Sequence, residues 1–587
     1  MTYDLKIEGA RIVDGTGREA YDGDVGIQGG RIVELGRLSG GARRTIDAKG
    51  ALVTPGFVDV HSHYDGQISW DDELAPSSWH GITTCLMGSC GVGFAPVRDE
   101  DHDRLIRLME GVEDIPESAL AEGITWGWST FGEYLDRLSE RPRLIDIGAQ
   151  VPHDALRMFA MGERATYREP ANEADVALMR RELGAALDAG AFGFSTGRTD
   201  NHRGKDGSPT PSSEAGEREL AELAKVLSGR GRRILQAVSD FDMATDRSRF
   251  DAEFDILEDM ARASGMPLSI SVMQRTGDSE QWRRIFQRIE RANAAGLELR
   301  AQVAPRAIGV LLGLEATFHP FMGFPTYKKL SQLPIAERVA ELQKPEVKTR
   351  LLGESSERVA GDGSSIPPLA DQLLANLDFV SMSLFKLNAS NRLNYEPARE
   401  SSLFGDAMRR GVRPLEAVYD ALLEDQGRAL LYFPIYNYAS GTLDEVGEML
   451  RHKFSIIGLG DGGAHVGTIC DASYPSFVLS HWVRDRSRDR LSLERAVQML
   501  SADGAAWLGL SDRGTVEVGK RADLNVIDLS TVELEAPHLV RDLPAGGRRL
   551  LQAARGYLAT VVAGEIVREN GATTDARPGR ILRAGAR

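Results

Sequence analysis

The stretch that decides the fold is residues 55–96, PGFVDVHSHYDGQISWDDELAPSSWHGITTCLMGSCGVGFAP. Residues 57–60, FVDV, are largely apolar and β-prone and follow a Pro-Gly pair, which predicts a short buried strand. Side chains alternate along a strand, so His61 and His63 point the same way, roughly 6–7 Å apart. Two imidazoles on one face can bind one metal ion. The alternative is two polar side chains that leave the strand into solvent.

A second apolar strand is predicted at residues 82–87, and it ends in the turn Gly88-Ser89-Cys90-Gly91. Strand and helix patterns alternate beyond it. Apolar residues at helical spacing precede strands at residues 191–195, 234–238 and 268–273. Repeated strand–helix units of this kind indicate a parallel sheet.

The two ends of the chain have a different sequence pattern from the strand–helix region between them. Residues 1–54 contain short alternating segments separated by glycine-rich turns, and the C-terminal residues contain similar segments. The predicted strands are residues 5–7, 11–13, 25–27, 31–33, 524–527, 560–562 and 565–567.

Composition limits the classes of function. A chain of 587 residues can hold more than one domain. Its formal net charge of −16 argues against nucleic acid or an anionic membrane as a partner, because both require a cationic face. The start of the sequence shows no secretory pattern, and three cysteines are no disulfide framework, so we expect a cytoplasmic protein with reduced thiols.

Several stretches resemble one enzyme superfamily. PGFVDVHSHYD resembles the first barrel strand of the amidohydrolase superfamily, and residues 81–96 resemble the second strand of its N-acyl-D-amino-acid deacylase (D-aminoacylase) branch. Three more stretches agree: AGAFGFSTG at 189–197 with strand four, GLGDG at 458–462 with the turn after strand eight, and GTVEVGKRADL at 514–524 with the C-terminal signature.

The resemblance implies an architecture. We expect a (β/α)₈ barrel over residues 55–510 and a small β-sandwich domain formed jointly by residues 1–54 and 511–587. Catalytic groups should lie at the carboxyl ends of the barrel strands. Residues 305–400 are rich in prolines and charges, and we interpret them as an insertion that is either a lid over the barrel mouth or surface decoration.

The resemblance also implies a metal site. His61, His63 and Cys90 would be ligands, and a thiolate suits zinc. Asp461 would be both a metal ligand and the general base and acid, because a carboxylate beside a metal can accept a proton from water and pass it to a leaving amine. The alternatives are a small buried cysteine and a common Asp-Gly turn.

The sequence departs from the branch in its other ligands. The strand-five and strand-six segments, residues 234–240 and 269–274, contain no histidine, and the strand-four segment offers no lysine for a bridging carbamate. The remaining set is enough for one zinc ion with an open position. Two ions would need new ligands, and another divalent metal is also compatible with the set.

Five further residues are candidates for binding the substrate: His153, His202, Gln236, Gln274 and His465. The resemblance places His153 in a turn after strand three, His202 follows strand four, and Gln236 and Gln274 occupy the strand ends where the histidines are missing. His465 follows Asp461 closely and could instead orient it or bind the metal. The branch holds a substrate carboxylate with a basic residue after strand eight, but residues 465–474 contain neither arginine nor lysine. Arg198, Lys205 and Arg275 remain as alternatives.

The resulting functional hypothesis is a metal-dependent hydrolase of a non-peptide C–N bond, first of all the linear amide of an N-acyl amino acid-like small molecule. A second hypothesis is a hydrolase of a cyclic amide, carbamate or urea. A third is a catalytically inactive barrel that binds a ligand. A homo-oligomer is compatible with the sequence, although no stretch marks an interface.

Overall fold

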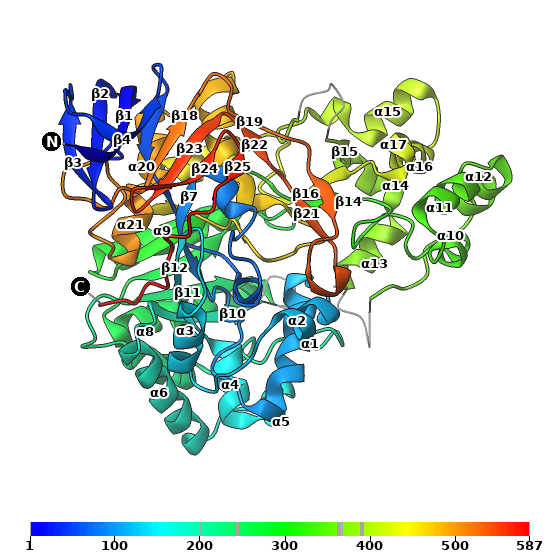
Figure 1. The fold of residues 1–587 in the computed structure, drawn as a ribbon. Coiled ribbons are helices and arrows are strands. Elements are labelled where there is room, and N and C mark those ends of the chain that lie inside the picture. Colours follow the sequence, from blue (N-terminus) through cyan, green and yellow to red (C-terminus); the bar gives the residue numbers. More distant parts are fainter. Residues whose placement is uncertain are drawn as a thin grey trace.

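The computed structural model describes residues 2–199, 201–241, 246–360, 366, 368–387 and 393–585 (Figure 1). Within these residues, eight parallel strand positions surround one axis. They are β6 (Phe57–Asp59), β7 (Ile82–Met87), β8 (Asp146–Ala149) continued by β9 (Val151–Pro152), β10 (Gly193–Arg198), β11 (Ile234–Ser239), β12 (Leu268–Val272), β13 (Leu299–Val303) and β17 (Ser455–Ile457).

The barrel closes between its first and last strands. Ser62 and Gly462 form a parallel bridge just beyond β6 and β17, and His63 N–H donates to Gly462 O at 2.8 Å. The predicted (β/α)₈ barrel is therefore confirmed. Because all the strands are parallel, the segments that follow β6 and β17 meet at the same end of the barrel.

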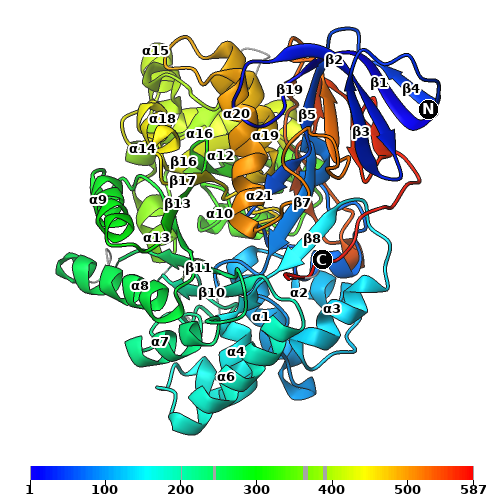
Figure 2. The same ribbon diagram turned by 90° about the vertical axis from the view of Figure 1, so that its left-hand side faces the viewer.

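Amphipathic helices cover the outside of the barrel (Figure 2). Three of them match the helical periodicities in the sequence: α6 (Glu173–Asp188), α7 (Glu217–Lys225) and α8 (Phe250–Ser264). Gly265 ends α8 in a left-handed conformation, with φ of +67°, which glycine adopts without steric cost. The other covering helices are α1 (His102–Glu113), α2 (Glu117–Gly123), α3 (Phe131–Ser139), α4 (His153–Met161), α9 (Gln281–Ala294), α18 (Asp444–Arg451), α20 (Leu493–Leu500) and α21 (Ala502–Leu508).

Strands from the two ends of the chain lie in one sheet. Strand β5 (Leu52–Pro55) pairs with β1 (Tyr3–Ile12) on one side and with β18 (Leu524–Ile527) on the other. Two short strands were predicted at residues 5–13, but β1 is continuous there, with an irregular register around Gly9. The remaining strands of this sheet are β2 (Tyr21–Gln28), β3 (Arg31–Gly36), β4 (Ala42–Asp47), β23 (Tyr557–Val562), β24 (Glu565–Glu569) and β25 (Ala572–Thr573). We propose residues 1–54 and 511–587 as the two parts of this domain.

The segment between β13 and β17 is folded rather than irregular, and it extends past residue 400 (Figure 1, right). It has its own apolar core around Phe321, Leu351 and Val418. Several of its prolines begin helices, where the missing N–H costs nothing, so the proline content that suggested a loop marks helix starts instead. Its elements are β14 (Ile308–Leu312), α10 (Pro325–Leu330), α11 (Ile335–Leu342), α12 (Pro345–Leu352), α13 (Pro368–Ala375), α14 (Leu377–Val380), β15 (Phe385–Lys386), α15 (Leu403–Arg410), α16 (Pro414–Leu422), α17 (Glu424–Gly427) and β16 (Leu431–Tyr436).

In the described ranges, no helix combines the length and the apolar character that crossing a membrane requires.

Candidate metal centre

The two histidines predicted to bind metal follow β6, at the end of the barrel where Ser62 pairs with Gly462. His61 and His63 are buried, with ring centroids 5.3 Å apart and an edge-to-face arrangement. The His61 N–H donates to Asp59 Oδ1 at 3.0 Å, which fixes the backbone where the strand ends. Both rings therefore face the same space, as the alternation of a strand predicts.

Cys90 enters this space from the turn after β7. Its Sγ lies 3.3 Å from His61 Nε2, and its backbone has a φ of +56°, which is uncommon for a residue with a side chain. The turn packs closely against β10, since a Cβ at Gly91 would lie 2.7 Å from Gly197 N. One donor atom from each of His61, His63 and Cys90 lies within 4.8 Å of the others.

Asp461 adds a carboxylate from the segment after β17. Its Oδ1 is 3.3 Å from His61 Nε2 and 3.7 Å from His63 Nε2. Its backbone also has a positive φ, +46°. The barrel thus brings together two imidazoles, a thiol and a carboxylate from three strand ends, a donor set that suits zinc.

The electrostatics of the cluster favour a bound cation. Burial lowers the pKa of His61 to about 4, against the raising effect of its hydrogen bond to Gln302, so the ring is neutral and free to coordinate. Burial also raises the pKa of the Cys90 thiol and of the Asp461 carboxyl. Among the described residues, no lysine or arginine lies within ion-pairing distance of Asp461. A metal ion would supply the missing positive charge and favour the anionic forms.

Gln302, at the end of β13, orients His61. Its Oε1 lies 2.6 Å from His61 Nδ1, and its Nε2 donates to Ser269 Oγ at 3.0 Å. With Gln302 Oε1 as the acceptor, His61 carries its proton on Nδ1 and presents Nε2 to Cys90 and Asp461. Gln302 was not among the predicted site residues, because residues 299–303 were not predicted as a strand, although their apolar alternation was the available signal.

Glu113, the last residue of α1, is the second residue that the sequence analysis missed. It is 1% exposed, and its Oε1 lies 3.1 Å from His63 Nδ1, but the two atoms are not aligned as a hydrogen bond. Its Oε2 lies 3.9 Å from His465 Nε2. Burial, followed by the charge of Asp461, raises the pKa of Glu113 well above its ordinary value. The available signal was a glutamate four residues after Met109 on the apolar face of a helix.

Two of the five substrate-binding candidates, His202 and His465, line a cavity of about 330 Å³. The same cavity is lined by the four predicted metal ligands. Burial lowers the pKa of His202 and of His465 to about 4. The other three make contacts inside the fold. His153 contacts Thr196 and Glu219, Gln236 accepts a hydrogen bond from Cys90 N at 2.7 Å, and Gln274 accepts one from Ala439 N at 3.0 Å.

The structure distinguishes between the three cationic residues considered for a substrate carboxylate. Arg198 forms two hydrogen bonds with Glu253, and Lys205 pairs with Glu110 at 2.8 Å. Arg275 instead lines the cavity, donating to Ser239 O at 2.9 Å, and its guanidinium lies 5.6 Å from the ring centroid of Tyr436. No carboxylate of the described residues lies within 4 Å of it, so Arg275 is available to an anionic ligand.

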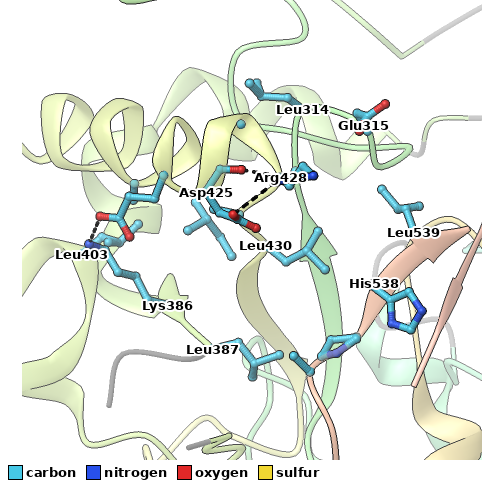
Figure 3. A pocket seen from close by; sticks show the side chains of 18 of the residues that line it. Leu314, Glu315, Lys386, Leu387, Leu403, Asp425, Arg428, Leu430, His538 and Leu539 are labelled. Carbon is cyan, nitrogen blue, oxygen red and sulfur yellow. Dashed lines mark hydrogen bonds and ion pairs between the residues drawn. The ribbon is translucent and has the colours of Figure 1, made fainter. Parts of the chain in front are cut away.

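A larger cavity, of about 850 Å³, lies between the inserted segment and residues 536–539 (Figure 3). Its charged groups pair with one another: Arg428 lies 3.5 Å from Asp425, and Lys386 contacts Glu424. Among the described residues that line this larger cavity, no set of catalytic groups points toward a common centre. We therefore assign the catalytic site to the smaller cavity, beside His61 and His63.

The sequence profile of the amidohydrolase family matches residues 44–362 and 407–568, so the chain belongs to this family. It is 26% identical over 596 residues to the N-acyl-D-aspartate deacylase of Alcaligenes xylosoxydans xylosoxydans, covering 99% of this chain and 95% of the relative.

An N-acyl-D-glutamate deacylase of the same organism is 27% identical, over 99% of this chain and 97% of the relative. The structure of the N-acyl-D-glutamate deacylase from Bordetella bronchiseptica, complexed with zinc and a phosphonate inhibitor, superposes over 100% of both chains with a TM-score of 0.63 and 24% identity. The expected likeness to the D-aminoacylase branch is confirmed.

Proposed function

We propose that this protein is a metal-dependent amidohydrolase that cleaves the linear amide of an N-acyl amino acid. One observation carries the proposal: a single cavity is lined both by the metal-ligand set and by Arg275, a cation that has no carboxylate of the described residues within 4 Å. An amide that bears a carboxylate matches both features. Similarity to N-acyl-D-aspartate and N-acyl-D-glutamate deacylases supports the same chemistry.

His61, His63, Cys90 and Asp461 would hold one zinc ion. When bound, zinc supplies Lewis acidity, which polarises a carbonyl group and lowers the pKa of a water molecule. Asp461 accepts a proton from the attacking water and donates it to the amide nitrogen as that nitrogen leaves. Gln302 keeps the Nε2 atom of His61 directed at the centre, so the imidazole does not have to reorient during the reaction.

Substrate turnover tests this proposal against its rivals. The purified protein, with zinc, is assayed against N-acyl-D-amino acids, N-acyl-L-amino acids, and the cyclic amides hydantoin and dihydrouracil. We expect kcat/KM for the best linear substrate to exceed that for the cyclic amides by about 100-fold or more, since a carboxylate paired with Arg275 contributes about that much. Hydrolysis of the cyclic amides alone would establish the second hypothesis. Binding without turnover would establish the third.

Arg275→Gln tests the carboxylate site. We expect KM for N-acyl amino acids to rise about 10- to 100-fold, because a charge-assisted hydrogen bond is lost, while kcat changes little. For an N-acyl alkylamine, which lacks the carboxylate, the variant and the wild type should have equal kinetic constants. The matched control is Arg284→Gln, since Arg284 is half-exposed and pairs with Asp278. An unchanged KM in Arg275→Gln would show that a group other than Arg275 binds the carboxylate of the substrate.

A further inference from the structure

A large part of the cavity wall is apolar. The inserted segment supplies most of it, from strands β14 and β16 and from the two helices α13 and α14. Val310 and Phe433 lie on adjacent antiparallel strands and are paired in register. Leu373 and Leu374 of α13 and Leu377 of α14 line the same cavity.

This wall is continuous with the reaction centre. The same cavity is lined by His61, Cys90 and Asp461 and by the leucines of α13. Apolar area that is removed from water on binding contributes about 25 cal/mol per Å², so an aliphatic group beyond the amide would be held by this surface. A substrate with only an acetyl group would leave most of the wall in contact with water.

Part of the wall lies outside the family match. The family match is interrupted between residues 362 and 407, and this interval contains α13 and α14. Leu373, Leu377, Val380 and Leu384 of this interval line the cavity. The family match therefore covers the strands of this wall, β14 and β16, but not its helices α13 and α14.

We infer that the inserted segment forms a binding site for a long aliphatic acyl chain, which makes the preferred substrate a fatty-acyl amide of an amino acid. The inference rests on the proposed function for the position of the amide and carboxylate. The acyl chain is the occupant that fits, because it can carry more methylene groups than any amino-acid side chain and can therefore cover apolar side chains from four elements, β14, β16, α13 and α14.

The experiment compares N-acyl-D-alanines with acyl chains of two to twelve carbons, together with N-acetyl derivatives of alanine, leucine and phenylalanine. We expect kcat/KM to rise about fourfold per methylene along the acyl series, until the cavity is filled. Lengthening the amino-acid side chain should have a much smaller effect. Equal kcat/KM for acetyl and decanoyl substrates, or a dependence on the side chain alone, would overturn the inference and leave the proposed function intact.

The variant Phe433→Ser should reduce the preference for decanoyl over acetyl substrates by about tenfold or more, because an aromatic wall is removed. The ratio of the two activities is measured in one sample, so partial loss of folded protein cancels. The matched control is Phe379→Ser, an aromatic residue on α14 that is 71% exposed, which should leave the ratio unchanged. Val310→Trp, which fills the cavity instead of opening it, should exclude the long substrates and retain the acetyl substrate.

Binding of decanoate separates failure of this inference from failure of the proposed function. Calorimetry with wild-type protein requires no turnover. If no N-acyl amino acid is hydrolysed but decanoate binds, and Phe433→Ser weakens that binding about tenfold, the acyl site stands without the deacylase reaction. If decanoate does not bind and kcat/KM does not change with the length of the acyl chain, there is no acyl site.

Discussion

Asp461→Asn should lose about 10²- to 10⁴-fold in kcat while the protein keeps its fold. Asparagine has the shape of aspartate and adopts the positive φ of +46° found at this position, but it cannot accept a proton from water. The effect should fall on kcat rather than on KM, because the proton is transferred only as the reaction proceeds. Steady-state kinetics on the best N-acyl amino acid, with circular dichroism of both proteins, measures it.

The matched control is Asp489→Asn. Asp489 is exposed and has nearly the same backbone conformation, with a φ of +48°, but it lies outside the cavity. This variant should have the kcat of the wild type. If Asp461→Asn also retained near-normal kcat, Asp461 would not be the general base, and another carboxylate such as Glu113 would have to be tested in that role.

The double variant His61→Asn/His63→Asn should lose stoichiometric metal. We expect about one zinc ion per chain in wild-type protein that is purified without added metal or chelator, and less than a tenth of that in the variant, because two of the four donors are removed. Elemental analysis gives the content without any activity assay. Glu113→Gln should weaken zinc affinity about 10- to 100-fold without abolishing it, since the carboxylate lies beside His63 Nδ1.

His452→Asn is the control for the histidine variants. His452 precedes β17, at the end of the barrel away from the cluster, and contacts Glu290 at 3.1 Å. Its removal should not change the metal content. About two ions per chain in the wild type would show that residues such as Glu113 and His465 replace the missing histidines of the branch. No binding even after zinc is added would falsify the metal centre.

Much of the architecture could be predicted from local sequence. The strand β7 follows from a short apolar run that ends in a glycine turn, and it is buried on both faces. The helices α6 to α8 follow from periodicity, because burial of one face repeats every 3.6 residues in a helix. His61 and His63 were predicted to point the same way because side chains alternate along a strand. Glycine and proline signals were less reliable: Gly9 distorts β1 without ending it, and prolines of the inserted segment begin helices.

The composition of the site could be predicted only where a motif is local. His61, His63, Cys90 and Asp461 each lie at the end of a recognisable strand or turn. Gln302 and Glu113 belong to no motif, and their proximity to the histidines depends on how β13 and α1 are placed in space.

The sequence by itself determined the repeated strand–helix units, the pair of histidines on one strand face, and the aspartate in its glycine-rich turn, since these depend on neighbouring residues and on backbone preferences. Only the tertiary structure decided which distant groups surround them. Gln302 is 241 residues from His61, and Gln236 is 146 residues from Cys90. It also decided that Arg275, unlike Arg198 and Lys205, has no carboxylate of the described part of the chain within 4 Å, because ion pairing depends on which carboxylates the closed barrel brings within reach.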